Sequence, residues 1–355
     1  MCVVTFDWEK NDAIEKFKNF DRKKSVSWVV VEITDSCNFN CKWCFANSMR
    51  GKGKSHMKME DMKRLLRYLS DNGVKQVTFS GGEPTVYPYL KDAIGTAKGL
   101  GMVVHMNTNG FLLSKEKAKE LHSLGLSQVQ INIDSLRSEK HDEVRGMKGS
   151  HGKAIEALKN AVGAGITCVS QTVITKENEG EIADIFRFSR SMGIQRCRVW
   201  DMTPSEGRAI ENENMISNNY LGTLQKLSDF AYSTGAKQVE AGEPLFMPNV
   251  TTDLKISGGY CVAAAGLYMT ISKSGDVYLC ATLRKPLYNI FDRMKEHGDL
   301  SEFHKEKARL FVESFKTSES CKECKFIEKC KGGCYTRRKY SQANEDYLCI
   351  FRQNT

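Results

Sequence analysis

The feature that most constrains the fold is an alternation of short β-branched segments with longer amphipathic segments, which runs from residue 28 to residue 200. The segments predicted to be strands are Trp28–Thr34, Gln76–Ser80, Met102–Asn107, Ser127–Asp134, Ile166–Thr172 and Ile194–Trp200. Those predicted to be helices are Met59–Ser70, Tyr89–Lys98, Ser114–Ser123, Lys153–Ala164, Asn178–Met192 and a closing polar helix over Asn214–Ser233. Repeated strand–helix units imply right-handed crossovers and a parallel sheet. Because six strands are too few for a closed eight-stranded barrel, we expect an open partial barrel of the α/β class.

The apolar positions of the predicted helices indicate which faces pack against the sheet. Apolar residues spaced at i, i+3, i+4 and i+7 mark one side of a helix. By this rule the residues expected to point inward are Met62, Leu65, Leu66, Leu69, Ile155, Leu158, Val162, Ile182, Ile185 and Phe186. Ser114 is the expected N-cap of its helix, because a serine hydroxyl accepts a hydrogen bond from a free amide of the first turn.

Three cysteines follow the first predicted strand at C-x3-C-x2-C spacing: Cys37, Cys41 and Cys44. Three thiolates this close can hold three corners of a cubane 4Fe–4S cluster and leave the fourth iron without a protein ligand. An open metal position is where chemistry takes place. The alternative is a zinc site, which normally needs a fourth cysteine or histidine nearby, and the next histidine is His56.

Composition places the chain among soluble proteins of a reducing compartment. The sequence begins without a basic region followed by an apolar one, so no secretory signal is predicted. No apolar run approaches the length of about 18 residues that a membrane span requires, and we expect a cytoplasmic protein. Its 13 cysteines then favour metal ligation over disulfides. The formal charge of +9 indicates a solvated basic surface, and we do not expect a nucleic acid partner.

The cysteine loop, with Trp43 directly before its last cysteine, resembles the signature loop of the radical S-adenosylmethionine (radical SAM) enzymes. In that family the open iron is chelated by SAM, and one electron splits SAM into methionine and a 5′-deoxyadenosyl radical that abstracts hydrogen from a substrate. The resemblance implies a partial (β/α)6 TIM-like radical SAM barrel over residues 28–240, preceded by a cap segment at residues 1–27.

Further motifs resemble the SAM-binding segments of the same family. The second predicted strand runs into Gly81, Gly82, Glu83 and Pro84, where two glycines let the backbone approach a ligand and Glu83 offers a carboxylate to the methionyl ammonium. The resemblance also assigns to SAM the side chains of Trp43, Asn109, Asn132, Asp134 and Arg145. A guanidinium suits the carboxylate of SAM, although a surface ion pair is the alternative for Arg145. Asn132 stands where relatives usually have serine, and a turn residue is its alternative.

The C-terminal cysteines resemble the SPASM domain, a cluster-binding extension of many radical SAM barrels, here placed at residues 241–355. By family ligation the outer auxiliary cluster takes Cys321, Cys324, Cys330 and Cys349, and the inner cluster takes Cys261, Cys280 and Cys334. No cysteine lies between residues 252 and 260, so we expect an open or non-cysteine position on the inner cluster. A zinc ribbon is the alternative for the C-x2-C pair. Ser274, Gly275 and Asp276 signal a hairpin after Cys261.

The implied reaction is SAM cleavage followed by hydrogen abstraction, with three 4Fe–4S clusters and a flavodoxin- or ferredoxin-like electron donor. SPASM relatives most often modify peptides or proteins, by crosslinking, oxidation or decarboxylation, and we expect such a substrate. The alternatives are a small-molecule dehydrogenase or decarboxylase in cofactor, haem-like or sugar metabolism, and a non-catalytic electron carrier. On the substrate side the sequence offers Asp201, Glu206 and Arg208 after the last predicted strand, where a plain loop is the alternative.

Overall fold

The structure is a computed structural model, and it describes residues 25–46, 48–50, 55–194, 196–234, 239–245, 255–258, 261–296, 298–315, 318–324, 327, 332–341 and 346–349. The predicted cap segment therefore lies outside the described residues except for residues 25–27, and so does Cys330. The main sheet has 11 strands in the order β10-β9-β8-β7-β6-β5-β4-β1-β11-β12-β13. Its middle portion is the parallel array that the alternating segments predict.

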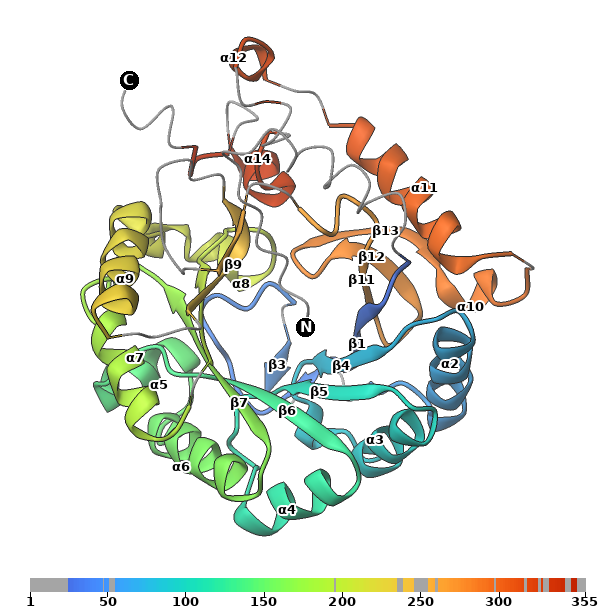
Figure 1. The fold of residues 1–355 in the computed structure, drawn as a ribbon, viewed down its shortest axis with the longest axis horizontal. Coiled ribbons are helices and arrows are strands. Elements are labelled where there is room, and N and C mark those ends of the chain that lie inside the picture. The colour runs from blue at the N-terminus through green and yellow to red at the C-terminus, as the bar shows by residue number, and fades with distance from the viewer. Residues whose placement is uncertain are drawn as a thin grey trace.

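Six parallel strands form that array and pair with one another in chain order. They are β1 (Trp28–Thr34), β4 (Gln76–Gly81), β5 (Val103–Asn107), β6 (Leu126–Asn132), β7 (Thr167–Ile174) and β8 (Arg196–Asp201). The helices on their outer side (Figure 1) are α2 (Met59–Asp71), α3 (Leu90–Gly99), α4 (Lys115–Ser123), α5 (Ser138–Arg145), α6 (Ser150–Gly163), α7 (Ile182–Ser191) and α9 (Tyr220–Thr234). The predicted α/β class and the partial barrel are confirmed, and α5 is the helix that the sequence reading left out.

The C-terminal strands extend the same sheet at both edges. Strands β9 (Val239–Leu245) and β10 (Lys255–Gly258) continue the parallel pairing beyond β8. On the other side β11 (Tyr268–Ile271) pairs in parallel with β1, and the antiparallel strands β12 (Asp276–Cys280) and β13 (Leu283–Asn289) follow. The predicted hairpin around Gly275 is present, and it lies directly beside the first strand of the barrel.

The strands place alternate side chains on the helix-covered face. Val29, Val31 and Ile33 of β1 belong to the main core, whereas Glu32 lies on the other face of the strand. The inward positions predicted in α2 and α7 are buried, and the Ser114 hydroxyl accepts a hydrogen bond from the amide of Lys117.

One predicted core residue is wrong. Val162 of α6 is 38% exposed. The buried face of this helix is made instead by Ala154, Ala157, Leu158 and Ala161. The spacing of the larger residues suggested a face rotated away from the one that packs, because small alanines determine the contact.

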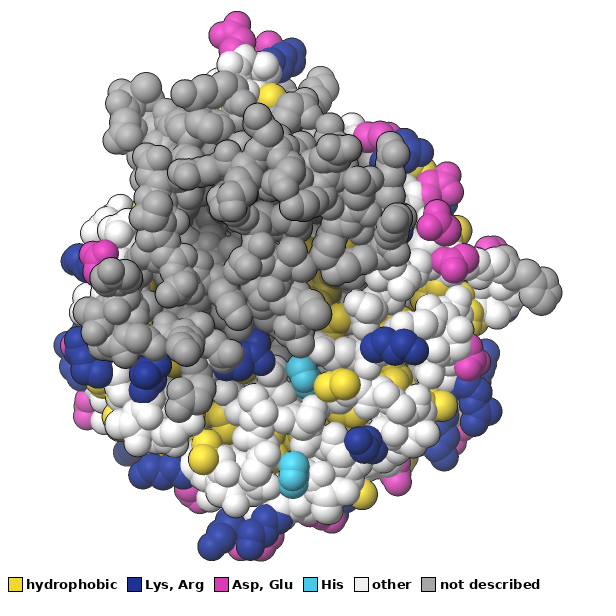
Figure 2. Space-filling view, viewed as in Figure 1, with side chains coloured by type: hydrophobic (Ala, Val, Ile, Leu, Met, Phe, Trp, Pro, Cys, Tyr) yellow, Lys and Arg dark blue, Asp and Glu magenta, His cyan; other side chains and the backbone are white. Residues whose placement is uncertain are grey.

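The remaining described elements connect these strands or follow them. They are β2 (Ser36–Cys37), β3 (Met49–Arg50), η1 (Pro84–Val86), α8 (Arg208–Glu211), η2 (Glu213–Met215), α10 (Ile290–Arg293), α11 (Leu300–Glu313), α12 (Glu319–Lys322) and α14 (Tyr335–Tyr340). Among the described helices, none combines the length and the apolar character that a membrane crossing demands. On the face shown in Figure 2, lysine and arginine side chains are spread along the rim with acidic side chains among them.

Candidate active site at the ends of the strands

The three cysteines of the first loop lie together just beyond β1. Cys37 ends the short strand β2, and no described cysteine is in a disulfide. Burial raises the pKa of the Cys37 thiol to about 12, and the nearby Glu83, Cys41 and Cys44 act in the same direction. Burial also raises the pKa of Cys41, with Cys44 acting in the same direction. The structure thus brings together the three thiols that the sequence spacing singled out.

The end of α5 supports one side of this loop. The amides of Asn40 and Lys42 donate to the carbonyl oxygens of Arg145 and Val144, at 3.3 and 2.9 Å. Gly146 follows with a φ of 61°, and a Cβ there would lie 2.4 Å from the carbonyl oxygen of Asn40. A glycine is therefore required where this helix ends against the cysteine loop.

Gly81 and Gly82 support the same loop from β4. A Cβ on Gly81 would lie 2.3 Å from the carbonyl oxygen of Thr34, and one on Gly82 would lie 2.1 Å from that of Ser36. The amide of Gly82 donates to Thr34 at 2.7 Å. The room left by these glycines is thus filled by the backbone that leads to the cysteines, and their contact with SAM stays a prediction.

Glu83 also has a different setting from the one its motif suggested. Its side chain is 1% exposed. Oε1 accepts hydrogen bonds from the amide and hydroxyl of Thr85 and from the hydroxyl of Thr108, at 2.9, 2.7 and 2.6 Å. Oε2 accepts from the amide of Asn109 at 2.7 Å. The carboxylate joins η1, which starts at Pro84, to the loop after β5, and a role of Glu83 toward an ammonium group stays a prediction.

The two asparagines predicted at this edge lie at the ends of neighbouring strands. Asn109 donates through Nδ2 to Oδ1 of Asn38 at 2.7 Å, and its Oδ1 accepts from the amide of Phe111 at 2.9 Å. Asn132 ends β6 and is half-buried, and its Nδ2 lies 3.4 Å from Oδ1 of Asp134. Asn109 thus contacts the cysteine loop, and Asn132 lies beside the carboxylate that the sequence placed at the same edge.

Arg145 and Asp134 form a buried ion pair, so the surface pair considered as the alternative for Arg145 is not what the structure has. Their side chains are 10% and 1% exposed, and NH1 of the arginine is 3.5 Å from Oδ2 of the carboxylate. The guanidinium also lies over the rings of Phe39 and Trp43, at 5.6 and 6.0 Å from the ring centres. Burial raises the pKa of Asp134, and Arg145 opposes that rise. A guanidinium is thereby held next to the three thiols.

A second group of thiols lies in the C-terminal segment. Burial raises the pKa of Cys261 to about 12 and that of Cys334 to about 11, and Cys280 acts in the same direction on both. The sulfur of Cys280 is 3.3 Å from the hydroxyl of Thr282, which is 2.9 Å from the hydroxyl of Thr336. Cys261, Cys280 and Cys334 are therefore neighbours, as the predicted inner ligand set requires.

The predicted outer ligand set is described only in part. Cys321 belongs to α12, and its carbonyl oxygen accepts a hydrogen bond from the amide of Cys324 at 3.2 Å. The amide of Cys349 donates to the carbonyl of Asp346 at 2.9 Å. Cys330 lies outside the described residues, so this set remains a prediction.

The predicted substrate-side residues bind other parts of the chain instead. Asp201 is buried and accepts hydrogen bonds from Tyr347 at 2.7 Å and Thr203 at 3.0 Å, with NH1 of Arg337 at 3.8 Å. Glu206 lies 3.3 Å from Nζ of Lys339. These two carboxylates join the end of β8 to the C-terminal segment, because that segment lies across the strand ends. A role for them on the substrate side stays a prediction.

Arg208, the third candidate, contacts the cysteine loop. Its Nε donates to the carbonyl oxygen of Cys41 and its NH2 to that of Ser48, both at 2.8 Å. The side chain is buried. Arg208 thus contacts the backbone that carries the thiols, and a role for it on the substrate side stays a prediction.

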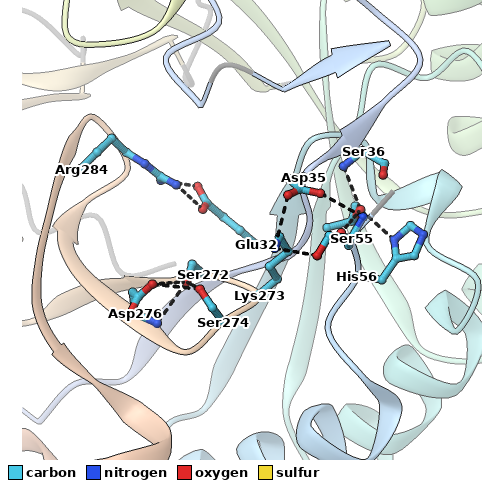
Figure 3. A network of polar contacts seen from close by, with 11 residues as sticks. Glu32, Asp35, Ser36, Ser55, His56, Ser272, Lys273, Ser274, Asp276 and Arg284 are labelled. Atoms are coloured by element: carbon cyan, nitrogen blue, oxygen red, sulfur yellow. Dashed lines mark hydrogen bonds and ion pairs between the residues drawn. The ribbon is translucent and has the colours of Figure 1, made fainter. Parts of the chain in front are cut away.

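The sequence did not predict two ion pairs that join segments far apart along the chain (Figure 3). Arg284 of β13 forms a pair with Glu32 of β1, and Lys273 lies 3.3 Å from Asp35 and 2.7 Å from the hydroxyl of Ser55. Glu32 is the one charged residue in an otherwise apolar strand, a signal that could have marked it as functional or paired. Its partner could not be named from the sequence.

The donor sets fit the clusters that the sequence predicts. Each described group of three thiols is free of disulfides and gathered from one loop or from adjoining segments. Among the described residues, no three histidine, cysteine or acidic side chains converge as the ligands of a single metal ion do. The corners of a cubane are further apart than the ligands of one ion, and soft thiolates are the donors that iron–sulfur clusters take.

Known proteins resemble the chain over nearly its whole length. Residues 31–189 match the radical SAM superfamily. An AdoMet-dependent heme synthase from Oleidesulfovibrio alaskensis is 26% identical over 353 residues, covering 92% of this chain and 87% of that protein. A PqqA peptide cyclase from Bradyrhizobium diazoefficiens is 24% identical over 315 residues, covering 86% of this chain and 80% of that protein.

A solved structure of SuiB from Streptococcus suis, bound to S-adenosylmethionine, has the same fold. Its TM-score is 0.71 at 19% identity, with 96% of this chain and 83% of that chain covered. A second structure of SuiB is bound to its precursor peptide SuiA. The match of residues 31–189 identifies a radical SAM superfamily domain in this chain, and the sequence relatives that cover most of the chain are enzymes. The family implies a 4Fe–4S cluster and the use of SAM.

Proposed function

We propose that Cys37, Cys41 and Cys44 hold the SAM-binding 4Fe–4S cluster and that the chain cleaves SAM to start a hydrogen abstraction. The observation that carries this proposal is the gathering of these three thiols at the end of β1, beside the buried Arg145. When bound, the cluster supplies the electron that splits SAM into methionine and the 5′-deoxyadenosyl radical.

The residues around the loop bind and orient the cofactor in this proposal. Arg145 pairs with the carboxylate of SAM, because its guanidinium is held by Asp134 and by two aromatic rings at the correct edge of the barrel. Asn109 and Asn132 offer amide groups at the ends of β5 and β6 for the remaining polar groups of SAM. Gly81, Gly82, Glu83 and Pro84 position the cysteine loop, and their backbone lies next to it.

We also propose two auxiliary clusters in the C-terminal segment. Cys261, Cys280 and Cys334 hold the inner one, and Cys321, Cys324, Cys330 and Cys349 hold the outer one. The inner cluster has one position without a cysteine, and the hydroxyls of Thr282 and Thr336 lie beside Cys280 there. Substrate titration followed by electron paramagnetic resonance tests this, and a spectrum indifferent to every substrate would count against an open position.

The substrate that we propose is a peptide or protein, with electrons supplied by a flavodoxin- or ferredoxin-like donor. Support comes from the similarity to a PqqA peptide cyclase and from the fold shared with SuiB. The second candidate is a tetrapyrrole or another small molecule, favoured by the longer match to a heme synthase. Ala281, directly after Cys280, lacks the acidic side chain that anaerobic sulfatase maturases carry there, so we do not propose that activity.

The decisive experiment is anaerobic reconstitution with iron and sulfide, followed by reduction in the presence of SAM. Formation of 5′-deoxyadenosine is expected. A triple variant with Cys37, Cys41 and Cys44 replaced by alanine should lose this activity and keep the iron bound by the C-terminal cysteines. Cleavage of SAM by that variant, or zinc in place of iron in the wild type, would refute the proposal.

A second experiment separates the two substrate classes. The reconstituted enzyme is incubated with SAM and either the peptides encoded next to its gene or iron–coproporphyrin-like tetrapyrroles. The correct class is the one that accelerates 5′-deoxyadenosine formation and itself changes in mass. A response to tetrapyrroles alone would overturn the peptide proposal and leave the SAM-cleavage proposal intact.

A further inference from the structure

A short helix, α8, and the turn after it also contact the cysteine loop. Arg208 lies at the start of this helix. Its guanidinium donates to the carbonyl oxygens of Cys41 and Ser48, and its amide donates to that of Cys44 at 3.2 Å. One arginine thus contacts the backbone of the last two cysteines and of Ser48 after them.

Asn212 adds a contact from the end of the same helix. Its Nδ2 donates to the carbonyl oxygen of Lys42 at 3.1 Å and to that of Arg208 at 2.9 Å. Trp43 packs against a small apolar cluster that includes Ala209 of this helix. The carbonyl oxygens of Cys41, Lys42 and Cys44 are therefore all satisfied by α8 and its C-cap, in a part of the loop without regular secondary structure.

The charge of Arg208 also acts on the loop. Its side chain is buried, so its electrostatic effect is screened less than that of a surface arginine. Its guanidinium donates to the carbonyl oxygen of Cys41, so a positive charge lies directly beside the loop. Positive charge in a low-dielectric site favours any negative charge added nearby.

We propose that Arg208 is a positioning residue of the SAM-binding cluster. Its hydrogen bonds hold the loop in the conformation that presents the three thiolates, and its charge favours the reduced, more negative state of the cluster. The inference rests on the proposed function, in which Cys37, Cys41 and Cys44 hold that cluster. Groups outside the ligands commonly change cluster stability and potential in this way.

Two substitutions at Arg208 separate its hydrogen bonds from its charge. Arg208→Gln removes both the positive charge and the planar guanidinium that donates two hydrogen bonds. Arg208→Lys keeps the charge and removes only the planar donor geometry. The full-length proteins are reconstituted, and the SAM-responsive signal in electron paramagnetic resonance is followed in a redox titration. Arg208→Gln should shift the midpoint potential of this signal to more negative values, and Arg208→Lys should leave it close to that of the wild type.

Cluster stability is the second readout. Both variants should lose the SAM-responsive cluster to a chelator about 10-fold faster than the wild type, because both lose hydrogen bonds to the loop. Asn212→Ala should accelerate this loss without a change in potential, and it keeps the test open if Arg208→Gln fails to fold. The control is Arg309→Gln, which removes an exposed arginine of α11 and should change neither quantity.

The outcomes distinguish this inference from the proposed function. A wild-type protein without a SAM-responsive signal refutes the proposed function itself. A wild-type signal together with unchanged potential and unchanged cluster loss in Arg208→Gln overturns the role of Arg208 alone. Equal shifts of potential in the lysine and glutamine variants would overturn the part assigned to its charge.

Discussion

Arg284 and Glu32 form a two-pronged ion pair between strands that are 252 residues apart in the sequence. NH1 and NH2 of the arginine lie 2.7 and 2.9 Å from the two carboxylate oxygens (Figure 3). The guanidinium lies over the ring of Tyr278, 4.3 Å from the ring centre. The backbone pairing of β1 with β11 reaches Val31 and goes no further. The ion pair therefore joins the two parts of the chain where β1 leaves that ladder and leads toward Cys37.

Reversal of either charge in this pair should destabilise the protein. Glu32→Arg or Arg284→Glu leaves two like charges together in a mostly buried site, with an expected cost of about 3 kcal/mol in the free energy of unfolding. The double reversal should recover part of that loss, because the opposite charges face each other again. Chemical denaturation of the three variants measures the effect.

The matched control for this prediction is an exposed ion pair. Arg309 and Glu313 lie on successive turns of α11 with both side chains more than half exposed. Charge removal there should cost less than about 1 kcal/mol. Additive losses in the double reversal of Glu32 and Arg284 would show that the two side chains do not act as a pair.

Gly82→Ala should prevent the cysteine loop from reaching its observed position. The new Cβ would lie 2.1 Å from the carbonyl oxygen of Ser36, a backbone atom that moves only with the loop. We expect a lower iron content in the N-terminal site after reconstitution. Gly95→Ala in α3 meets no atom within 4 Å and should stabilise the protein by up to about 1 kcal/mol. Equal iron in both variants would contradict the prediction.

Glu83→Gln should lower the free energy of unfolding by about 3 kcal/mol, because the new amide group faces donors that the carboxylate now satisfies. Urea denaturation measures this loss. Glu120→Gln, at an exposed pair with Lys91, is the comparison and should cost less than about 1 kcal/mol. A Glu83 variant as stable as the wild type would show that these four hydrogen bonds contribute little.

His304 should make stability fall in acid. Its Nε2 donates to the carbonyl oxygen of Tyr268 and its Nδ1 accepts from the hydroxyl of Tyr288, both at 3.0 Å. Burial lowers its pKa to about 4. The unfolded chain takes up the proton near pH 6.5, so the stabilisation is present above that pH and is lost as the pH falls toward 4.

Between pH 7 and pH 5 the loss attributable to His304 should be about 2 kcal/mol. Denaturation curves of the wild type and of His304→Gln at both pH values measure it, since glutamine offers a donor and an acceptor but does not titrate in this range. The variant should show the smaller difference between the two pH values. Identical pH dependence in the two proteins would exclude His304 as the cause.

Features that depend on residues close in sequence could be read before the structure was known. The order of the six parallel strands follows from alternating periodicities, and the grouping of Cys37, Cys41 and Cys44 follows from their spacing on one loop. The face of α6 was misread around Val162 because alanines carry little signal in an apolar pattern, although they pack closely.

The tertiary structure alone decided which partners the charged and polar side chains have. Glu83, Arg208 and Arg284 each carry a charged group that suits a ligand, a substrate or another part of the chain equally well. Their actual contacts are brought together by crossovers of the sheet, with the carbonyl of Cys41 lying 167 residues from Arg208. A side chain shows its chemistry in the sequence, but its partner depends on how distant segments pack, and that is why the thiols could be named and the residues that hold them in place could not.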